Sequence, residues 1–163
     1  MIGTLEQILV EIEKLRKDNK KIVFTNGVFD ILHRGHVDYL KEAATFGDVL
    51  IIGVNSDASV KRLKGDDRPL NMETDRAFIL SELRSVDHIV IFENDTPIEL
   101  IRSIKPDILV KGGDYDPNMT DKSNAKFIVG SDIVSQNGGK VRIVNLTPER
   151  STTSTINKIR RNV

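Results

Sequence analysis

The stretch KIVFTNGVFDILHRGH, residues 21–36, decides the fold. Its segment IVF is a continuous apolar run, which is typical of a strand buried on both faces of a parallel sheet. The run ends near Asn26-Gly27, and a helix-like pattern begins near His36. In a parallel α/β sheet, this order predicts that the residues in between lie at the carboxyl edge of the sheet, beside a helix amino end.

The same alternation continues along the rest of the chain. Four later apolar segments are predicted as strands: 48–55, 88–93, 107–113 and 140–146. Helix-like segments separate them, over 36–46, 57–63, 74–84, 96–104 and, with a less regular pattern, 124–137. With the strand at 21–27, they predict a Rossmann-like α/β fold: an open parallel five-stranded sheet with helices on both faces. No repeat or linker interrupts the pattern, so residues 1–163 are expected to form a single domain.

Helix ends and one loop carry further signals. Residues 4–18 form an amphipathic helical pattern, and Thr4 fits a capping box with Gln7. Thr96 is predicted as the N-cap of the 96–104 helix, with proline at its first position. The polar, turn-rich segment 114–127 is expected to be either a surface excursion or a mobile cover over a substrate.

Composition excludes several function classes. The 163 residues include 24 Lys plus Arg and 24 Asp plus Glu, and a zero net charge argues against general affinity for nucleic acid or anionic membrane. The absence of cysteine excludes disulfides, thiolate metal sites and cysteine nucleophiles. No stretch approaches the ~18 apolar residues of a membrane helix, and the start lacks a signal-peptide pattern. A soluble, cytoplasmic protein is therefore expected.

Two histidines, His33 and His36, are the strongest candidates for chemistry. A helix amino end offers unpaired N–H groups and a positive dipole, and two imidazoles can donate further hydrogen bonds to phosphate oxygens. Gly27 and Gly35 would let a phosphate approach the backbone. Helix capping is an alternative role. A metal site would need His88, the only other histidine, which is expected at the opposite sheet edge; no metal-ligating residue is predicted.

Further motifs follow GVFDILHRGH in a fixed order: VNSD at 54–57, RLKG at 62–65, DR at 75–76 and STT at 151–153. The G-x-x-x-x-G-K-[ST] and G-x-G-x-x-G phosphate motifs are absent. The ordered set resembles the HxGH nucleotidyltransferase superfamily, in its cytidylyltransferase-like branch, over about residues 20–160. The family joins a nucleoside triphosphate to a phosphorylated small molecule and releases pyrophosphate.

The resemblance implies a role for each matching residue. His33, His36 and Lys64 would be catalytic. Nucleotide-binding residues would be Asn26, Gly27, Val28, Phe29, His33, Gly35, His36, Arg76, Lys111, Gly112, Asp114, Ser151 and Thr152. Substrate-binding residues would be Asp30, Asn55, Asp57 and Lys64. Taken alone, Lys64 also fits a solvated surface lysine, Arg76 an exposed helix arginine, Lys111–Asp114 a tight turn, and Ser151 with Thr152 an ordinary helix start. The resemblance also implies Mg²⁺ held mainly by the triphosphate, and a homodimer.

Within this family, the longer matches FTNGVFDILHRGHVDYL, VNSDASVKRLKGDDRP and LVKGGDY are most similar to adenylyltransferases. Those enzymes transfer AMP from ATP to D-glycero-β-D-manno-heptose 1-phosphate, giving ADP-heptose and pyrophosphate for lipopolysaccharide core or another surface glycan. LTPERSTT also lacks the arginine-threonine lead-in of the cytidylyltransferases, which favours ATP. Two alternatives stay open. One is a cytidylyltransferase using CTP and glycerol 3-phosphate or another polyol phosphate, and the other is a catalytically silent nucleotide-binding module.

Overall fold

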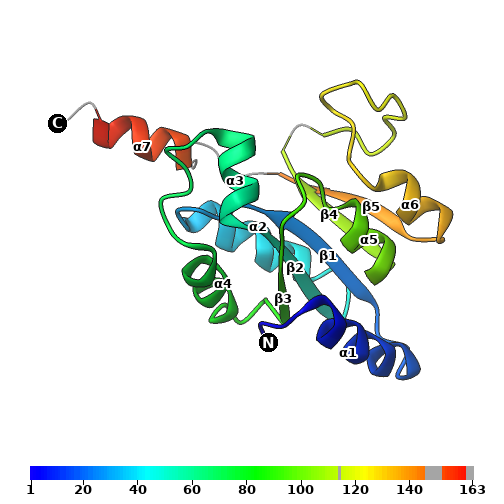
Figure 1. Ribbon diagram of the computed structural model, residues 1–163. Coiled ribbons are helices and arrows are strands. Elements are labelled where there is room, and N and C mark those ends of the chain that lie inside the picture. The colour runs from blue at the N-terminus through cyan, green and yellow to red at the C-terminus, as the bar shows by residue number, and fades with distance from the viewer. Residues whose placement is uncertain (114, 146–151, 161–163) are drawn as a thin grey trace.

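The computed structural model describes residues 1–113, 115–145 and 152–160 (Figure 1). Its strands are β1 (Ile22–Gly27), β2 (Val49–Asn55), β3 (His88–Phe92), β4 (Ile108–Gly112) and β5 (Lys140–Val144). Its helices are α1 (Leu5–Lys17), α2 (Arg34–Ala44), α3 (Asp57–Lys64), α4 (Glu73–Ser81), α5 (Ile98–Ile104), α6 (Ser131–Gln136) and α7 (Thr152–Arg160). The strands form one sheet in the order β3-β2-β1-β4-β5, and every pairing is parallel. The predicted five-stranded open parallel sheet is confirmed.

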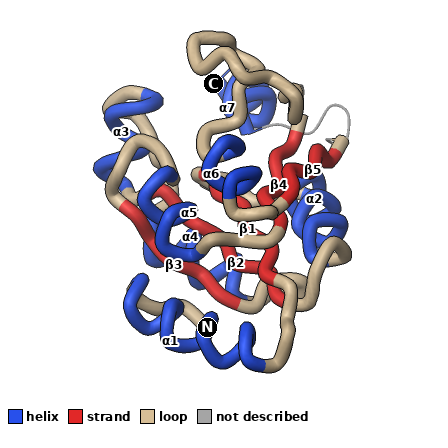
Figure 2. Tube along the Cα trace, turned by 90° about the vertical axis from the view of Figure 1, so that its right-hand side faces the viewer, coloured by secondary structure: helices blue, strands red, loops and turns tan. Residues whose placement is uncertain are grey.

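The sheet separates two apolar layers. Ile22 and Phe24 of β1 pack with α1, α5 and α6, whereas Val23 points to the other face and packs with α2 and α4. Successive side chains of a strand alternate between faces, so a strand covered on both sides must be apolar at every position. This explains the uninterrupted apolar runs of the sequence. It also confirms that helices cover both faces, as Figures 1 and 2 show.

The first helix packs on its own domain. Thr4 and Gln7 form the predicted capping box, with the Gln7 N–H donating to Thr4 Oγ1 at 3.4 Å and the Thr4 N–H to Gln7 Oε1 at 2.9 Å. Ile8 and Ile12 are buried in the layer that contains α5. Arg16 Nη2 donates to the carbonyls of Ile104 and Lys105, at the end of α5, at 2.8 and 2.6 Å. The helix therefore closes one face of the sheet.

Several helix starts differ from the prediction, and α4, which begins at Glu73 rather than residue 74, also ends at Ser81 rather than residue 84. Helix α2 begins at Arg34 rather than near His36, because the His33 carbonyl already accepts the N–H of His36 at 2.9 Å. Helix α5 begins one residue later than predicted, with Pro97 as N-cap and no side-chain cap. The predicted 124–137 helix is wrong over its first half, and only α6 is helical. The Asn124 side chain accepts the Lys126 N–H there, Asp121 accepts the Ser123 N–H just before it, and these contacts hold the chain in turns instead.

The carboxyl edge of the sheet is where a ligand is expected. The chain proceeds from β1 to β2 on one side, and β4 lies on the other side of β1, so the strand order reverses there. Ligands of open α/β sheets bind at such switch points. Figures 1 and 2 both place α3, α7 and the 115–127 excursion at one end of the molecule and α1 at the other. None of the helices in the described ranges has the length and apolar character of a membrane span.

Candidate active site

The two histidines lie together at the amino end of α2. His33 is the N-cap residue, and His36 lies in the first turn beside the buried Gly35. Their rings stack with centroids 3.9 Å apart and an interplanar angle of 18°. The backbone N–H of His33 also donates to His36 Nδ1 at 3.4 Å. His33 therefore occupies a cap position, as the capping alternative requires, but the stacked pair also presents two imidazoles at a helix amino end, which suits an anion.

Burial controls the protonation of His36. Burial, the neighbouring His33 and the Lys64 ammonium lower the pKa of His36 to about 4. The imidazole is thus neutral at neutral pH and carries one N–H. Because Nδ1 accepts the His33 N–H, the proton belongs on Nε2. A neutral imidazole in this tautomer donates one hydrogen bond without adding a charge to the site.

Phe29 supports the second ring. Its backbone lies in the left-handed region at φ 51°, and its ring meets His36 edge-on at a centroid distance of 5.3 Å. Gly27 makes room for it, since a Cβ there would lie 3.0 Å from Phe29 Cε2. The Asn26-Gly27 signal that ends the strand thus also sets the position of the imidazole.

Lys64 ends α3 at the same edge. Partial burial and then the Arg68 guanidinium lower its pKa, while the Asp30 carboxylate acts in the opposite direction. The ammonium also contributes to the lowered pKa of His36. Gly65 follows at φ 93° and ends the helix. Lys64 is exposed, as the surface-lysine alternative requires, and its catalytic role stays a prediction.

Asp30 is buried and holds the segment that follows α3. Its carboxylate accepts hydrogen bonds from Arg68 Nε at 2.6 Å and from the backbone N–H groups of Leu70 and Asn71 at 2.8 and 2.9 Å. Burial alone would raise the pKa of Asp30, but the Asn71 N–H and the Arg68 guanidinium outweigh it and hold the pKa below the ordinary value. Substrate binding by Asp30 stays a prediction, because the structure shows its oxygens used by the protein.

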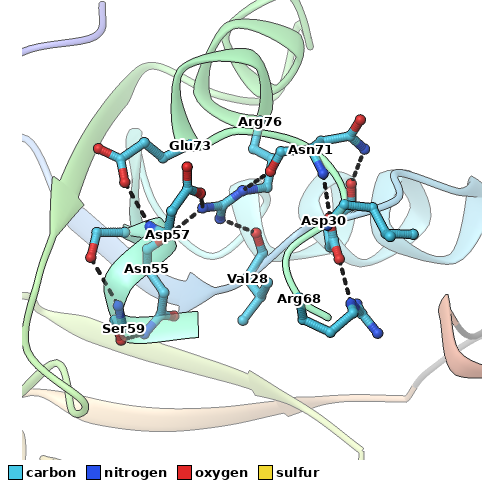
Figure 3. Close-up of polar contacts among 11 residues, drawn as sticks. Val28, Asp30, Asn55, Asp57, Ser59, Arg68, Asn71, Glu73 and Arg76 are labelled. Atoms are coloured by element: carbon cyan, nitrogen blue, oxygen red, sulfur yellow. Dashed lines mark hydrogen bonds and ion pairs between the residues drawn. The ribbon is translucent and has the colours of Figure 1, made fainter. Parts of the chain in front are cut away.

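Arg76 projects from α4 into the protein and is 1% exposed. Its guanidinium donates to the carbonyls of Asn71 at 3.0 Å, Val28 at 2.6 Å and Asn55 at 2.8 Å, and to Asp57 Oδ1 at 2.7 Å (Figure 3). The alternative of an exposed helix arginine is wrong. Phosphate binding by Arg76 stays a prediction, and four of its five N–H groups already have protein acceptors.

The predicted substrate residues Asn55 and Asp57 belong to the same network. Asn55 Nδ2 donates to Ser59 Oγ at 3.1 Å, and the Asp57 backbone N–H donates to Glu73 Oε2 at 2.6 Å (Figure 3). The Arg76 guanidinium bonds to both residues and to the Val28 carbonyl, just after β1, so it ties the ends of β1 and β2 to α4. Their contact with substrate remains a prediction.

A second polar pair lies at the switch point. The Lys111 ammonium on β4 donates to Asn26 Oδ1 on the adjacent β1. Burial lowers the pKa of Lys111 to about 8. Gly112 ends β4, and the chain bends at Gly113, whose φ is 100°. The alternative of a tight turn over Lys111–Asp114 stays a prediction, since it includes residue 114. Asp114, predicted to bind nucleotide, lies outside the described residues.

The final helix approaches the histidine segment. Thr152 Oγ1 donates to the carbonyl of Ile31 at 3.3 Å, close in sequence to His33. Thr152, the first residue of α7, therefore lies beside the segment that carries His33. Ser151 lies outside the described residues.

The third histidine cannot complete a metal site. His88 begins β3 and pairs with Ile51, in the middle of β2, whereas His33 follows the carboxyl end of β1. The predicted placement of His88 toward the opposite edge is confirmed. Among residues 1–113, 115–145 and 152–160, no three His, Asp or Glu side chains form a group that could hold a metal ion.

Sequence reasoning missed the partners that organise the site. Arg68, Asn71 and Glu73 bond to Asp30 and Asp57 from positions far along the chain. No local spacing predicts such pairs, since they form only when the segment after α3 folds back on β1. An uneven charge pattern near 66–76 is the one available signal, and it does not identify partners.

The edge can therefore bind and orient a polyphosphate. It combines a helix amino end, a neutral imidazole donor, the Lys64 ammonium and the hydroxyl-bearing start of α7. Donors of this kind stabilise charge that develops on phosphoryl oxygens during transfer.

Comparisons with known proteins agree with this geometry. The bifunctional protein HldE of Nitratiruptor sp. is 54% identical over 159 residues, which is 98% of this chain and 32% of the relative. That of Aliarcobacter butzleri is 52% identical over 161 residues, 99% of this chain and 31% of the relative. The chain thus spans about a third of the length of these relatives.

Solved structures and a family profile give the same result. The lipopolysaccharide core biosynthesis protein from Thermoplasma volcanium superposes with a TM-score of 0.59 at 33% identity, covering 78% of this chain and 97% of that one. Pantoate-beta-alanine ligase from Francisella tularensis shares the fold, with a TM-score of 0.61 at 17% identity over 94% of this chain and 69% of that one. The profile described as cytidylyltransferase-like matches residues 24–159. The chain belongs to the cytidylyltransferase-like family.

Proposed function

We propose that the protein is a nucleotidyltransferase that transfers AMP from ATP to D-glycero-β-D-manno-heptose 1-phosphate, giving ADP-heptose and pyrophosphate. The observation that carries nucleotidyl transfer is the stacked His33–His36 pair at the amino end of α2. Family membership supports the same reaction class. The heptose enzymes often form one half of a two-activity protein, which fits relatives called bifunctional and about three times as long.

The end product is proposed to be a surface glycan. A solved relative that is 33% identical over most of its length is described as a lipopolysaccharide core biosynthesis protein. An activated heptose is the donor from which such a core would be built. The heptose 1-phosphate would have to come from a phosphorylating enzyme acting earlier.

The chain's own residues position the reaction and stabilise charge. An oxygen of the acceptor phosphate forms a bond to the α-phosphorus of ATP while the bond from that phosphorus to the bridging oxygen breaks. The electron pair leaves with pyrophosphate. His36 Nε2–H, the N–H groups that open α2 and the Lys64 ammonium face the oxygens on which charge accumulates. Positioning of the two substrates supplies the rest of the rate enhancement.

Mg²⁺ is proposed to enter with the nucleotide. The buried carboxylate of Asp30, three residues before His33, already accepts three N–H donors and does not fit a metal ligand. Magnesium is usually held by one or two carboxylates plus substrate phosphates, and it neutralises phosphate charge. Pyrophosphate release should stop after exhaustive EDTA treatment and return when Mg²⁺ is added. Full activity in EDTA would refute this part of the proposal.

One assay tests the substrate pair. ATP, CTP, GTP and UTP are each combined with D-glycero-β-D-manno-heptose 1-phosphate or with glycerol 3-phosphate, and pyrophosphate release is measured. A site built to hydrogen-bond ring hydroxyls should reject an acceptor that lacks them, so ATP with the heptose should exceed CTP with glycerol 3-phosphate by at least ~10²-fold in kcat/KM. A preference for CTP and glycerol 3-phosphate would refute the adenylyltransferase. If calorimetry shows that ATP binds but no pair of substrates is turned over, the proposed enzyme is refuted in favour of a catalytically silent nucleotide-binding module.

The chain is proposed to act as a homodimer, because members of the family it resembles do so. Sedimentation equilibrium at micromolar concentration should give twice the chain mass of 18.3 kDa. A monomer under those conditions would contradict the proposal.

A further inference from the structure

Lys111 is a half-buried cation at the carboxyl edge of the sheet, and its hydrogen-bond partner, Asn26, is neutral. Its ammonium donates to Asn26 Oδ1, and lysine can only donate, so the amide must turn its oxygen toward Lys111. That orientation leaves the Asn26 Nδ2 hydrogens available to another acceptor. Within the part of the chain that the structure describes, Asn26 is the hydrogen-bond partner of Lys111 Nζ, and no carboxylate forms an ion pair with it.

A cation in this setting favours an anionic ligand. Charged groups removed from water are normally paired or hydrogen-bonded, because an uncompensated charge is costly. Burial lowers the pKa of Lys111 to about 8, so the side chain is still mainly an ammonium at neutral pH. Two of its three N–H groups and the Asn26 amide are therefore donors without a protein acceptor among the described residues.

The Lys111–Asn26 pair and the histidines flank β1 from opposite faces. Asn26 lies two residues after Phe24, so its side chain points to the same face of the sheet, the one covered by α1, α5 and α6. In agreement, a Cβ on Gly53 would lie 3.3 Å from Asn26 Cβ and 3.1 Å from Leu100 of α5. The histidines open α2, which covers the other face. A ligand lying across the end of β1 would therefore meet the imidazoles on one side and Lys111 on the other.

In-line displacement assigns different substrates to the two sides. The attacking and leaving oxygens lie on opposite sides of the transferred phosphorus. With the leaving pyrophosphate held by the histidines and the start of α7, the attacking phosphate arrives from the face of α5. We propose that Lys111 and Asn26 bind the phosphate group of the acceptor, rather than the nucleotide. This inference rests on the proposed nucleotidyl transfer, and it makes the pair an acceptor-specificity element.

Substitution separates the acceptor from the nucleotide. Lys111→Met keeps the length of the side chain and removes its charge. It should lower kcat/KM for the acceptor by roughly 10- to 100-fold, while the Kd of α,β-methylene-ATP, measured by calorimetry, changes by less than about threefold. Lys111→Arg should restore part of the loss, and Asn26→Ala should lower the same constant to a smaller extent. Lys140→Met, at the exposed start of β5, is the matched control and should leave both constants unchanged.

The opposite pattern would overturn the inference. If Lys111→Met weakens binding of α,β-methylene-ATP as much as it weakens use of the acceptor, the pair belongs to the nucleotide. If neither constant changes in a folded Lys111→Met variant, Lys111 and Asn26 bind neither the acceptor nor the nucleotide.

A second measurement does not require turnover. In wild-type protein saturated with α,β-methylene-ATP, inorganic phosphate should shift the Lys111 ¹³Cε resonance to saturation, and it should not shift that of Lys140. No shift of the Lys111 resonance overturns the inference even if the enzyme is active. An inactive wild-type protein that shows the shift would instead refute the proposed reaction and leave the phosphate site standing.

Discussion

Two sets of basic side chains lie along the same sheet edge and are used differently. The guanidinium groups of Arg76 and Arg68 have protein acceptors: Arg76 donates four hydrogen bonds, and Arg68 forms an ion pair with Asp30 at 2.6 Å. Lys111 bonds to a neutral amide, and His36 accepts one backbone N–H. Burial lowers the pKa of both, so their charged forms are incompletely stabilised by the protein.

The difference teaches how to separate binding groups from structural ones. All four residues look alike in sequence, because each is basic and lies in or near a family motif. Partners decide between them: a guanidinium with its donors occupied stabilises loops, whereas the Lys111 ammonium, bonded to a neutral amide, is available to an anion. The arginines are expected to control stability, and the histidines and Lys111 are expected to control turnover.

Removing Arg76 should give the largest effect. Arg76→Ala leaves three carbonyls and the Asp57 carboxylate without their donor in a buried site, so it should lower the free energy of unfolding by about 3–5 kcal/mol. Urea denaturation followed by circular dichroism measures the change. Arg84→Ala, at an exposed position after α4, is the control and should change stability by less than about 0.5 kcal/mol. Equal effects of the two substitutions would contradict a structural role for Arg76.

The histidines should show the reverse pattern. His33→Ala and His36→Ala should each lower kcat by ~10²-fold or more, because donors to the developing phosphoryl charge are lost. Circular dichroism and urea denaturation should show that both variants stay folded. His88→Ala, which changes a histidine at the start of β3, should keep kcat near the wild-type value. Near-normal kcat in either site variant would remove that residue from the catalytic set.

Acid should weaken the two regions over different pH ranges. The pKa of His36 is depressed from 6.5 to about 4, so the stability linked to its neutral form is complete above pH 6.5 and is lost as the pH falls toward 4. The pKa of Asp30 is held below 3.8, so its contribution persists to lower pH and is lost only below 3.8. We therefore expect urea denaturation from pH 3 to 8 to show two changes. In His36→Gln, the free energy of unfolding should depend less on pH between 4 and 6.5, and in Asp30→Asn it should depend less on pH below 3.8. Unchanged slopes in those ranges would contradict the assignment.

The smallest effect is expected at Gly27. A Cβ there would lie 3.0 Å from Phe29 Cε2, so Gly27→Ala should displace the ring that supports His36 and cost about 1 kcal/mol of stability with a several-fold loss of kcat. Phe29→Leu leaves more room at that point. The double variant should therefore lose less stability than the two single losses combined. Additive losses would show that the steric contact has no effect.

Much of the fold was predictable because its signals are local. The continuous apolar runs predict strands buried on both faces, and the structure places all five within a residue or two of the predicted bounds. The Thr4–Gln7 capping box and the histidines at a helix amino end follow from the same kind of signal. The 124–137 helix failed because Asp and Asn side chains compete for the backbone there, which hydrophobic spacing does not reveal.

The sequence by itself determined the sheet, the strand–turn–helix corner that carries His33 and His36, and the family motifs in their order, because each depends on residues close together in the chain. Only the tertiary structure decided which motif residues are already used by the protein. Asp30 meets Arg68, Arg76 meets Val28, and Lys111 meets Asn26 across separations of 38, 48 and 85 residues. Spacing cannot predict such contacts, since they are created when parallel strands bring distant segments to one edge, and their partners then fix burial, charge and hydrogen bonding.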